Sequence, residues 1–324
     1  AYEISLGLVG SEMCIRDSLL TVPTIFGLTV IVFLLVRFLP GDVIDAMSGG
    51  EVAIDEGRRK MIMDRLGLND PIIVQYGNWL KDIFSGDLGV SLRNAQPLRE
   101  VFIGALPVTL ELGIIAAFIA CIFGIPLGII SATKPNTFID GFVRFFGLVG
   151  LSFPNFWLAT LLLLFTSLYF NWIPGLTYIP IWKDPIGNLK QMILPSVILS
   201  FQLMAIAMRM TRATMLEELK QDYVRTARAK GLRERIVLLR HALRNAMVPI
   251  MTMFGLSLAG MIGGLVISEQ VFAIPGMGRL IVDAVSNRDY PLIQGSLLLI
   301  AVSYVIVNLI IDLSYLYFDP RIRY

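Results

Sequence analysis

The sequence predicts an all-α membrane protein with six transmembrane helices and a small extracytoplasmic helical loop region. Hydrophobic residues make up 56% of the 324-residue chain and charged residues 16%, with a mean hydropathy of +0.72. This composition is far more apolar than that of a soluble globular domain. Six apolar stretches reach the length of about 20 residues that a helix needs to cross a bilayer. Lys and Arg collect in alternate loops between these stretches, as they do on the cytoplasmic side of membrane proteins.

The N-terminal residues 1–18 are left out of the fold prediction. Residues 5–18 read SLGLVGSEMCIRDS and resemble the peptide that a sequencing adapter encodes when it is translated, so we expect 1–18 to be a non-native leader. The other interpretation is a short cytoplasmic leader. Cys14 falls in this segment and Cys121 lies far along the chain, so the two cysteines do not indicate a disulfide framework.

The apolar stretches are taken as spans in chain order. The first is uncharged and is followed by Pro40 and Gly41, which end a helix. Pro126, Pro154 and Pro195 lie inside later spans and allow kinks. The predicted spans cover residues 19–36, 106–132, 145–170, 192–208, 247–268 and 292–318.

Glycines are concentrated in the fifth predicted span. Its sequence GLSLAGMIGG contains Gly255, Gly260, Gly263 and Gly264. Glycines at such spacing let two membrane helices approach closely, which we expect to be their role. A gating hinge is the alternative, because a transport cycle needs helices that bend.

The charges of the loops predict the orientation. Residues 209–244 hold ten Lys or Arg against four Asp or Glu, the loop at 134–144 is also net positive, and Arg321 and Arg323 close the chain. These segments and both termini are therefore predicted to be cytoplasmic. The opposite side receives the more acidic first loop, about 39–101, and the loops around Lys183 and Asp283.

The first outer loop is long enough to have structure of its own. After Asn69, Asp70 and Pro71, which form a helix start, apolar residues recur at mainly helical spacing. We predict a small helical cap whose stripe packs against neighbouring spans. Ligand binding by its aromatic residues is the alternative. The stripe consists of Ile72, Ile73, Tyr76, Trp79, Leu80 and Ile83.

The basic segment after the fourth span, about 209–246, predicts two amphipathic helices that meet at Gly231. Leu216, Leu219, Tyr223 and Ala227 form one apolar series, and Gly231 can adopt a positive φ and end the first helix. A second series continues beyond the glycine. A helix pair of this kind can lie on anionic lipid headgroups. The second series is Leu232, Ile236, Leu239 and Leu243.

The stretch EELKQDYVRTARAKGLRERIVLLRHALRNAMVP resembles the cytoplasmic EAA loop of ABC importer membrane subunits, in the form found in dipeptide and oligopeptide permeases. The usual Glu-Ala-Ala positions read Arg225, Thr226 and Ala227, followed by Gly231, so the glutamate is absent, as is usual in this branch. Arg244 stands where many ABC permeases have a proline. The stretches FLLVRFLPGD, LSFPNFWLA, VFAIPGMGRLIVDAVSNRDYPLIQG and YFDPRIRY fit the same family.

The resemblance implies a type I ABC importer permease fold over residues 19–324 and a function. The chain would be the non-catalytic permease subunit of an ATP-driven importer of dipeptides, oligopeptides or related small solutes. It would form half of a pathway in a bacterial or archaeal cytoplasmic membrane. The implied partners are a second permease subunit, two ABC ATPase subunits that bind ATP and Mg, and an extracytoplasmic solute-binding protein. The long first loop resembles that of the first of two non-identical permeases.

The resemblance also assigns residues. The helix before Gly231 would be a coupling helix that docks on the ATPase, with Tyr223, Val224 and Ala227 as an apolar ridge. Arg225, Arg228 and Lys230 would form the polar rim. The full set of implied coupling residues is Asp222, Tyr223, Val224, Arg225, Thr226, Ala227, Arg228, Lys230 and Gly231.

Polar residues within spans are costly and mark either a pathway or an interhelical hydrogen bond. Glu111, Asn155 and Gln202 are the candidates for the translocation path, and Asn308 and Asp312 share the property. For each, the interhelical hydrogen bond is the default interpretation.

No catalytic residue, metal site, cofactor or nucleic-acid partner is expected on this chain. It contains no GxxxxGK[ST] phosphate loop, so nucleotide chemistry is expected on another polypeptide. His241 is the single histidine. A secondary, ion-coupled transporter is the alternative function, but inverted repeats are not apparent. An intramembrane enzyme would need clustered His, Cys or Asp within the spans.

Overall fold

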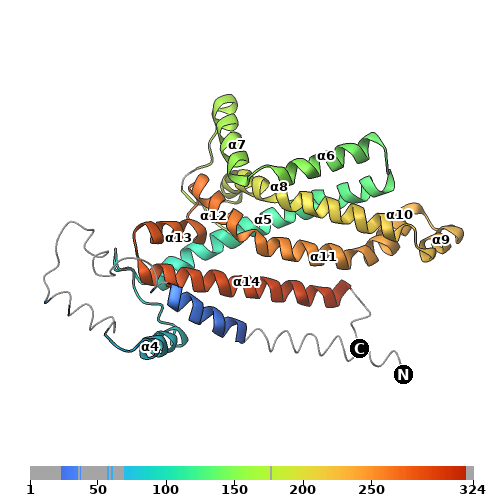
Figure 1. Cartoon of the computed structure of the whole chain (residues 1–324). Coiled ribbons are helices and arrows are strands. Elements are labelled where there is room, and N and C mark those ends of the chain that lie inside the picture. Colours follow the sequence, from blue (N-terminus) through green and yellow to red (C-terminus); the bar gives the residue numbers. More distant parts are fainter. Residues whose placement is uncertain are drawn as a thin grey trace, which may run out of the picture. The chain divides into compact units, whose positions relative to one another are not determined.

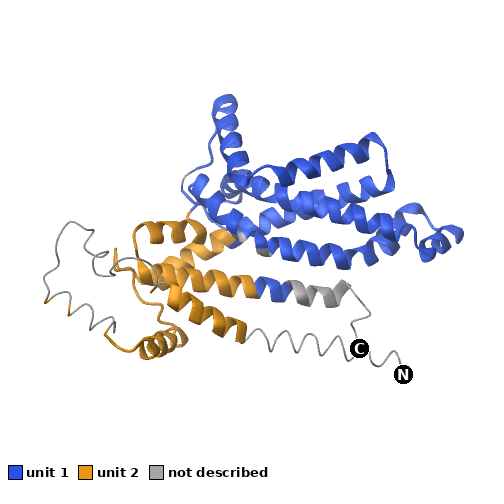
Figure 2. Ribbon diagram, viewed as in Figure 1, with its two compact units in different colours: residues 1–18, 110–274, 306–324 blue, residues 19–109, 275–305 orange. Residues whose placement is uncertain are grey.

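The computed structural model describes residues 23–35, 37, 57, 60, 69–175 and 177–318. Their regular structure is helical, apart from one isolated bridge between Val90 and Pro97 (Figure 1). The predicted leader, 1–18, lies outside the described residues. The chain divides into two compact units, described separately below (Figure 2). Unit 1 includes Leu110–Ile274 and Ile306–Tyr324, and unit 2 includes Leu19–Thr109 and Pro275–Val305.

Helix α8, Pro185–Glu218, is the centre of unit 1. It begins where the carboxylate of Asp184 accepts hydrogen bonds from the amides of Ile186 and Gly187, a capping arrangement that satisfies donors at the helix start. Two helices, α6 (Phe138–Ser152) and α11 (Leu243–Gly260), pack along α8. At 34 residues, α8 is about 51 Å long and exceeds the hydrocarbon core of about 30 Å.

Small residues bring α5, Leu98–Thr133, into close contact with α8 within unit 1. A Cβ atom on Gly124 would lie 2.8 Å from Cβ of Ala207, and one on Gly128 would lie 2.6 Å from Cβ of Thr211. Such distances leave no room for a methyl group at either glycine. The two glycines are one turn apart, which is the spacing of close helix contacts in membranes.

Of the three fifth-span glycines whose surroundings are described, Gly264 makes the predicted close contact. A Cβ there would meet Asn155 and Leu199 at 3.2 Å, whereas Gly260 and Gly263 have nothing within 4 Å. The tighter approaches to α8 are made by α5 and, at Gly150, by α6.

The third predicted span is not one helix. Two helices, α6 and α7 (Asn155–Phe170), meet at 103° (Figure 1). At the break, Phe153 is extended, with ψ 133°, as favoured before proline, and Pro154 precedes the first residue of α7. Pro126 and Pro195 leave α5 and α8 unbroken, so of the three predicted kinks only Pro154 produces a break.

The fifth predicted span is also divided. Helix α11 ends at Gly260 and α12, Ile262–Val271, follows at a bend of 54°. Met261 joins them with helical dihedrals, φ −70° and ψ −14°.

Unit 2 contains the helical cap expected in the first outer loop. Helix α4, Ile72–Phe84, follows Pro71, but no side chain caps its start. Tyr76 and Trp79 lie against Phe33 of the first apolar helix, with ring centroids 5.2 and 5.6 Å away. The hydroxyl groups of Tyr76 and Thr29 are 2.8 Å apart. Tyr76 and Trp79 therefore pack on a neighbouring helix, as predicted, whereas Ile72 and Ile73 of the same predicted stripe are exposed.

The remainder of unit 2 joins the outer loop to the C-terminal helices. The Oγ hydroxyl of Ser91 and the amide of Leu92 donate to Asp289, which lies between α13 (Met277–Ser286) and α14 (Tyr290–Phe318). The amide of Met277 donates to Oγ1 of Thr109 at 2.7 Å. These bonds fix the ends of α13 within the unit.

Length and composition identify three described helices that can cross a membrane: Leu98–Thr133, Pro185–Glu218 and Tyr290–Ile310. Counting each bent pair as one span gives up to five. The described part of the first predicted span, Pro23–Leu35, is shorter than these. Six spans therefore remain a prediction.

Replacing Gly128 with alanine tests the α5–α8 contact. The added methyl group forces the helices apart, and overpacking of this kind costs about 1–3 kcal/mol. We expect Gly128→Ala to lower the thermal midpoint of the detergent-purified protein. Gly141→Ala is the matched control, because its Cβ would have nothing within 4 Å. Equal midpoints for both variants would contradict the packing described here.

Candidate functional site

The predicted cytoplasmic segment, about 209–246, is shorter than expected. Helix α8 continues to Glu218, so Arg209 and Arg212 belong to a helix rather than to a loop. At the other end, α11 already begins at Leu243. The apolar pattern of the sequence located the end of the apolar part of α8, whereas the helix itself continues to Glu218. The connecting segment is therefore 219–242.

Helix α9, Asp222–Ala229, ends at Gly231 as predicted. Gly231 has φ +77°. Its amide donates to the carbonyl of Arg228 at 2.9 Å, and the amide of Leu232 donates to the carbonyl of Ala227 at 3.4 Å. This pair of bonds is the Schellman motif, which satisfies the last carbonyls of a helix and requires a left-handed residue.

The predicted apolar ridge points inward, which corrects its assignment as an outer docking surface. Val224 is 0% exposed and Ala227 8%. Both belong to a buried cluster of this same chain, whereas Tyr223 is exposed at its edge. The sequence identified the apolar side of α9 correctly but not what covers it. The rest of the buried cluster is Ala132, Met215, Val237, Ala242, Ala246 and Ile250.

The second amphipathic helix is also different from the prediction. After a single turn, α10 (Glu234–Ile236), the chain forms a π-helix, η1 (Val237–Ala242), that leads into α11. The wider turn of a π-helix buries Val237 and Ala242, five residues apart. The expected face is displaced: Leu232, Ile236 and Leu239 are exposed.

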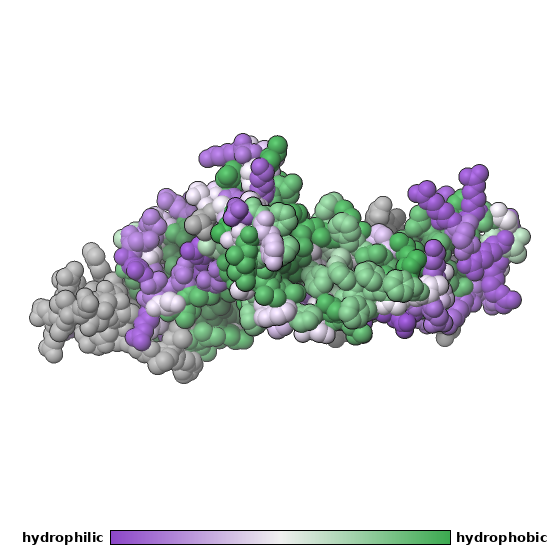
Figure 3. Space-filling model, turned by 90° about the horizontal axis from the view of Figure 1, so that it is seen from above, coloured by the Kyte–Doolittle hydropathy of each residue, from purple (hydrophilic) through white to green (hydrophobic). Residues whose placement is uncertain are grey.

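Polar side chains gather on the exposed surface of the segment (Figure 3), beside the exposed leucines and Ile236. Two hydrogen bonds, of 3.1 and 2.6 Å, join the guanidinium of Arg228 to the carboxylate of Glu234 across the Gly231 turn. Arg228 lowers the pKa of Glu234, so the pair persists at neutral pH and is lost as the pH falls through that lowered pKa. The exposed members of the predicted coupling set are Asp222, Tyr223, Arg225, Thr226, Arg228, Lys230 and Gly231.

Tyr223 anchors the start of α9. Its hydroxyl donates to the carboxylate of Glu218 at the end of α8. Partial burial and this bond raise the pKa of Tyr223 to about 12, so the hydroxyl is a protonated donor at neutral pH.

A buried carboxylate that the sequence did not single out organises the same end of unit 1. Asp140 of α6 is fully buried and accepts two hydrogen bonds from Arg212 of α8, at 2.6 and 3.0 Å. Oγ of Ser131, in α5, and the amide of Asn136 donate to it at 2.6 and 3.0 Å. Three helices therefore meet at one side chain. The signal in the sequence that could have drawn attention to Asp140 is the Thr-x-x-Asp capping pattern that begins at Thr137.

The polar residues predicted for the translocation path form contacts within unit 1. Nδ2 of Asn155, in α7, donates to Oε1 of Gln202, in α8, at 3.2 Å, which is the interhelical bond expected by default. The hydroxyl of Tyr178 donates to Glu111 at 2.5 Å, while the other carboxylate oxygen is buried without a hydrogen-bond partner in the described part of the chain. Glu111 is thus not brought together with the other two by any hydrogen bond. Asn308 is half-buried in α14.

The amino-acid sequence matches a known family along nearly the whole chain. Residues 124–324 match the family described as binding-protein-dependent transport system inner membrane component, and residues 12–113 match the N-terminal component of the same kind of system. The chain belongs to this family. It is a permease subunit of a binding-protein-dependent ABC transporter and a multi-pass membrane protein.

Relatives of this permease cover its full length. The oligopeptide transport system permease protein AppB of Bacillus subtilis is 39% identical over 313 residues, 96% of this chain and 98% of the relative. The dipeptide transport system permease protein DppB of Escherichia coli K12 is 37% identical over 336 residues, 97% of this chain and 99% of the relative.

A solved structure shows the same fold. A chain of the MetNI methionine ABC transporter, in a crystal form with inward-facing conformations, has a TM-score of 0.54 at 16% identity and covers 69% of this permease and 99% of that chain. At that identity, the likeness concerns the fold alone.

Truncating Val224 tests whether α9 is held by its buried side. Val224→Ala removes two methyl groups from the cluster, at a cost of about 1–2 kcal/mol, and we expect faster hydrogen exchange of the α9 amides. Thr226→Ala, on the exposed side, is the control and should leave the exchange nearly unchanged. Equal exchange in both variants would show that burial of Val224 does not hold the helix.

Proposed function

We propose that this permease forms half of the translocation pathway of an ATP-driven importer for dipeptides, oligopeptides or related small solutes. A separate extracytoplasmic binding protein would deliver the substrate. The names of the full-length relatives, AppB and DppB, support the peptide class. The family description supports dependence on a binding protein.

The attachment of α9 is the observation that supports a coupling role most strongly. Val224 and Ala227 pack against Ala132 at the end of α5, Met215 near the end of α8 and Ile250 of α11. Because the interior of a protein is close-packed, a displacement of α9 is passed on to the helices that contact it. The exposed polar side of α9 would then dock on an ATPase subunit, as polar rims do at such interfaces.

We therefore assign different roles to the buried and to the exposed coupling residues. Val224 and Ala227 would transmit movement to the spans, whereas Asp222, Arg225 and Thr226 would contact the motor. Arg228 and Lys230 would complete the polar surface beside the Gly231 turn. ATP and Mg would bind the ATPase subunits only.

The path itself would be lined jointly with a second permease subunit. We assign the polar lining of α7 and α8 to Asn155 and Gln202, which are hydrogen-bonded to each other at 3.2 Å. Replacing this hydrogen bond with one to a peptide group of the substrate would cost little free energy. Glu111 is a second proposed contact, because one of its buried carboxylate oxygens has no hydrogen-bond partner among the described residues and suits a cationic or amide N–H group.

Replacing Gly231 tests the coupling role. Gly231→Val places a β-branched residue at φ +77°, which costs roughly 1–2 kcal/mol and displaces α9. We expect loss of uptake with residual ATPase activity of the assembled transporter no longer stimulated by the binding protein. Gly231→Asn is the control, because Asn tolerates this conformation, and should retain most uptake. Normal transport by Gly231→Val would refute the coupling role.

Cysteine labelling tests the proposed orientation. Lys81→Cys, Lys183→Cys and Asp283→Cys should react with a membrane-impermeant maleimide in intact cells, and Lys220→Cys should react only after permeabilisation. The distribution of Lys and Arg is the reason. Labelling of Lys220→Cys from outside would reverse the orientation.

Reconstitution tests the proposed function as a whole. In proteoliposomes the permease alone should neither hydrolyse ATP nor accumulate a radiolabelled dipeptide. Addition of the partner permease, the two ATPases and the binding protein should restore both activities together. Accumulation driven by an ion gradient with this chain alone would instead favour a secondary transporter.

A further inference from the structure

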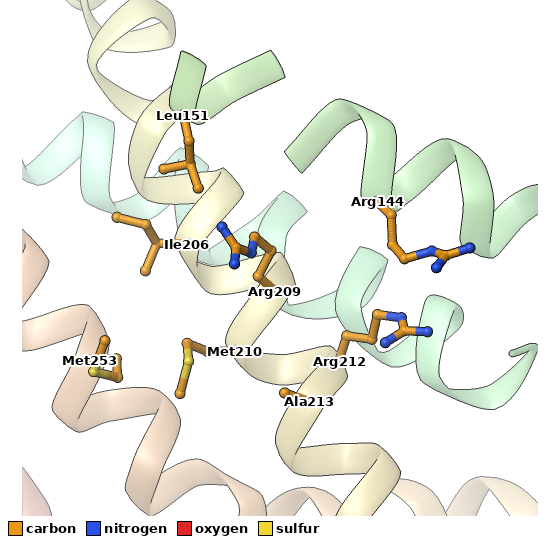
Figure 4. A pocket seen from close by; sticks show the side chains of 8 residues that line it. All are labelled: Arg144, Leu151, Ile206, Arg209, Met210, Arg212, Ala213 and Met253. Carbon is orange, nitrogen blue, oxygen red and sulfur yellow. The ribbon is translucent and has the colours of Figure 1, made fainter. Parts of the chain in front are cut away.

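A cleft of about 430 Å³ opens between α6, α8 and α11, within unit 1 (Figure 4). Its polar side is formed by three arginines: Arg144 on α6, and Arg209 and Arg212 on α8. Its other side is apolar. That side consists of Leu151, Ile206, Met210, Ala213 and Met253.

The cleft has an excess of positive charge. Asp140 holds Arg212 by two hydrogen bonds and lies 3.7 Å from Nε of Arg144, whose side chain is 54% exposed. Arg209 is exposed, and no acidic side chain in the described part of the chain forms an ion pair with it. One carboxylate therefore faces two of the three guanidinium groups, and each guanidinium has five N–H donors.

The stem of Arg209 lies against α6. A Cβ on Gly147 of α6 would lie 3.5 Å from Cγ of Arg209, so the absence of a side chain at Gly147 makes room for this stem. Arg212 is held by Asp140 one turn further along α8. Asp140 therefore positions one of the three cations before any ligand arrives, which reduces the entropy lost on binding.

The depth of the cleft in α8 suits an interfacial ligand. Arg212 precedes the end of α8, at Glu218, by about 9 Å along the axis. The predicted span within α8 ends at Met208, and Arg212 follows it by about 6 Å along the axis, which is the level of the lipid headgroups. In the proposed orientation this is the cytoplasmic leaflet.

We propose that the cleft binds an anionic phospholipid of the cytoplasmic leaflet, with the headgroup phosphate between Arg144 and Arg209 and an acyl chain along Met210 and Met253. Basic pockets between membrane helices on the cytoplasmic side suit phosphate headgroups. Arginine pairs well with phosphate because its planar donors match two oxygens. The apolar wall distinguishes a lipid from free inorganic phosphate. The proposal rests on the proposed orientation but not on the peptide substrate.

Native mass spectrometry of the detergent-purified full chain tests the site with defined probes. Phosphatidylglycerol and phosphatidylcholine of equal chain length are each added, and bound lipid is counted. We expect a clear preference for phosphatidylglycerol that falls by about tenfold or more in Arg144→Gln/Arg209→Gln, because two charge-assisted contacts are lost. Arg240→Gln, an exposed cation outside the cleft, is the control and should keep the preference.

The remaining arms exclude other occupants and misfolding. Arg144→Lys/Arg209→Lys should retain an intermediate preference, whereas an unchanged preference in the Gln variant would overturn the site. Displacement of the lipid by millimolar inorganic phosphate, or equal binding of both lipids, would overturn the assignment to a phospholipid. Absence of bound phosphatidylglycerol from the assembled transporter would mean that a partner subunit covers the cleft, which also overturns it. None of these results depends on peptide uptake.

Discussion

A fully buried carboxylate, Asp140, is the constraint on which one end of the helical bundle of unit 1, the end that leads to α9, depends. A charge without solvent is stable only when it is paired and its oxygens are hydrogen-bonded. Arg212 supplies the pairing by two bonds, and Ser131 and the amide of Asn136 complete it. These partners come from α8, from α5 and from the turn before α6. The charge is therefore satisfied in only one mutual arrangement of the three helices.

Close packing extends this arrangement toward the middle of the membrane. Gly124 and Gly128 of α5 admit Ala207 and Thr211 of α8, and Gly150 of α6 admits Ala205 of α8, where a Cβ would lie 2.8 Å away. Between helices in lipid, such contacts and polar bonds replace the hydrophobic effect as the source of stability. The helices are thus held together both at Asp140 and at the glycine contacts. Helix α9 packs on the end of this bundle through Val224 and Ala227. Movement of α9 requires movement of the bundle.

The features that the sequence predicted correctly are local. Gly231 ends α9 because the Schellman motif that closes this helix needs a residue with positive φ. A glycine that follows an amphipathic series can be recognised without knowledge of the fold. The aromatic stripe of α4 was likewise assigned correctly to packing. The inward direction of Val224 was missed because a helical pattern identifies an apolar side but not its neighbour. The π-helix after Ile236 then changed which residues of the next segment are buried.

The features that escaped prediction are long-range or depend on exact geometry. Asp140 and Arg212 are 72 residues apart, and a charged residue near a loop normally indicates only a solvated surface. The bend at Pro154 could not be distinguished from the unbroken helices at Pro126 and Pro195, because tertiary packing decides whether a proline in a membrane helix breaks it. The close glycine contacts fell in α5 rather than in the glycine-rich fifth span for the same reason.

A double-mutant cycle on Asp140→Asn and Arg212→Gln, read as the thermal midpoint of the detergent-purified chain, is the most direct measurement of this constraint. Each single variant should lower the midpoint, because it leaves a buried polar partner unsatisfied. The double variant should lose less than the sum of the two, with an interaction on the order of 1–3 kcal/mol. Additive losses would show that the two side chains act independently, and would contradict the central role assigned to Asp140.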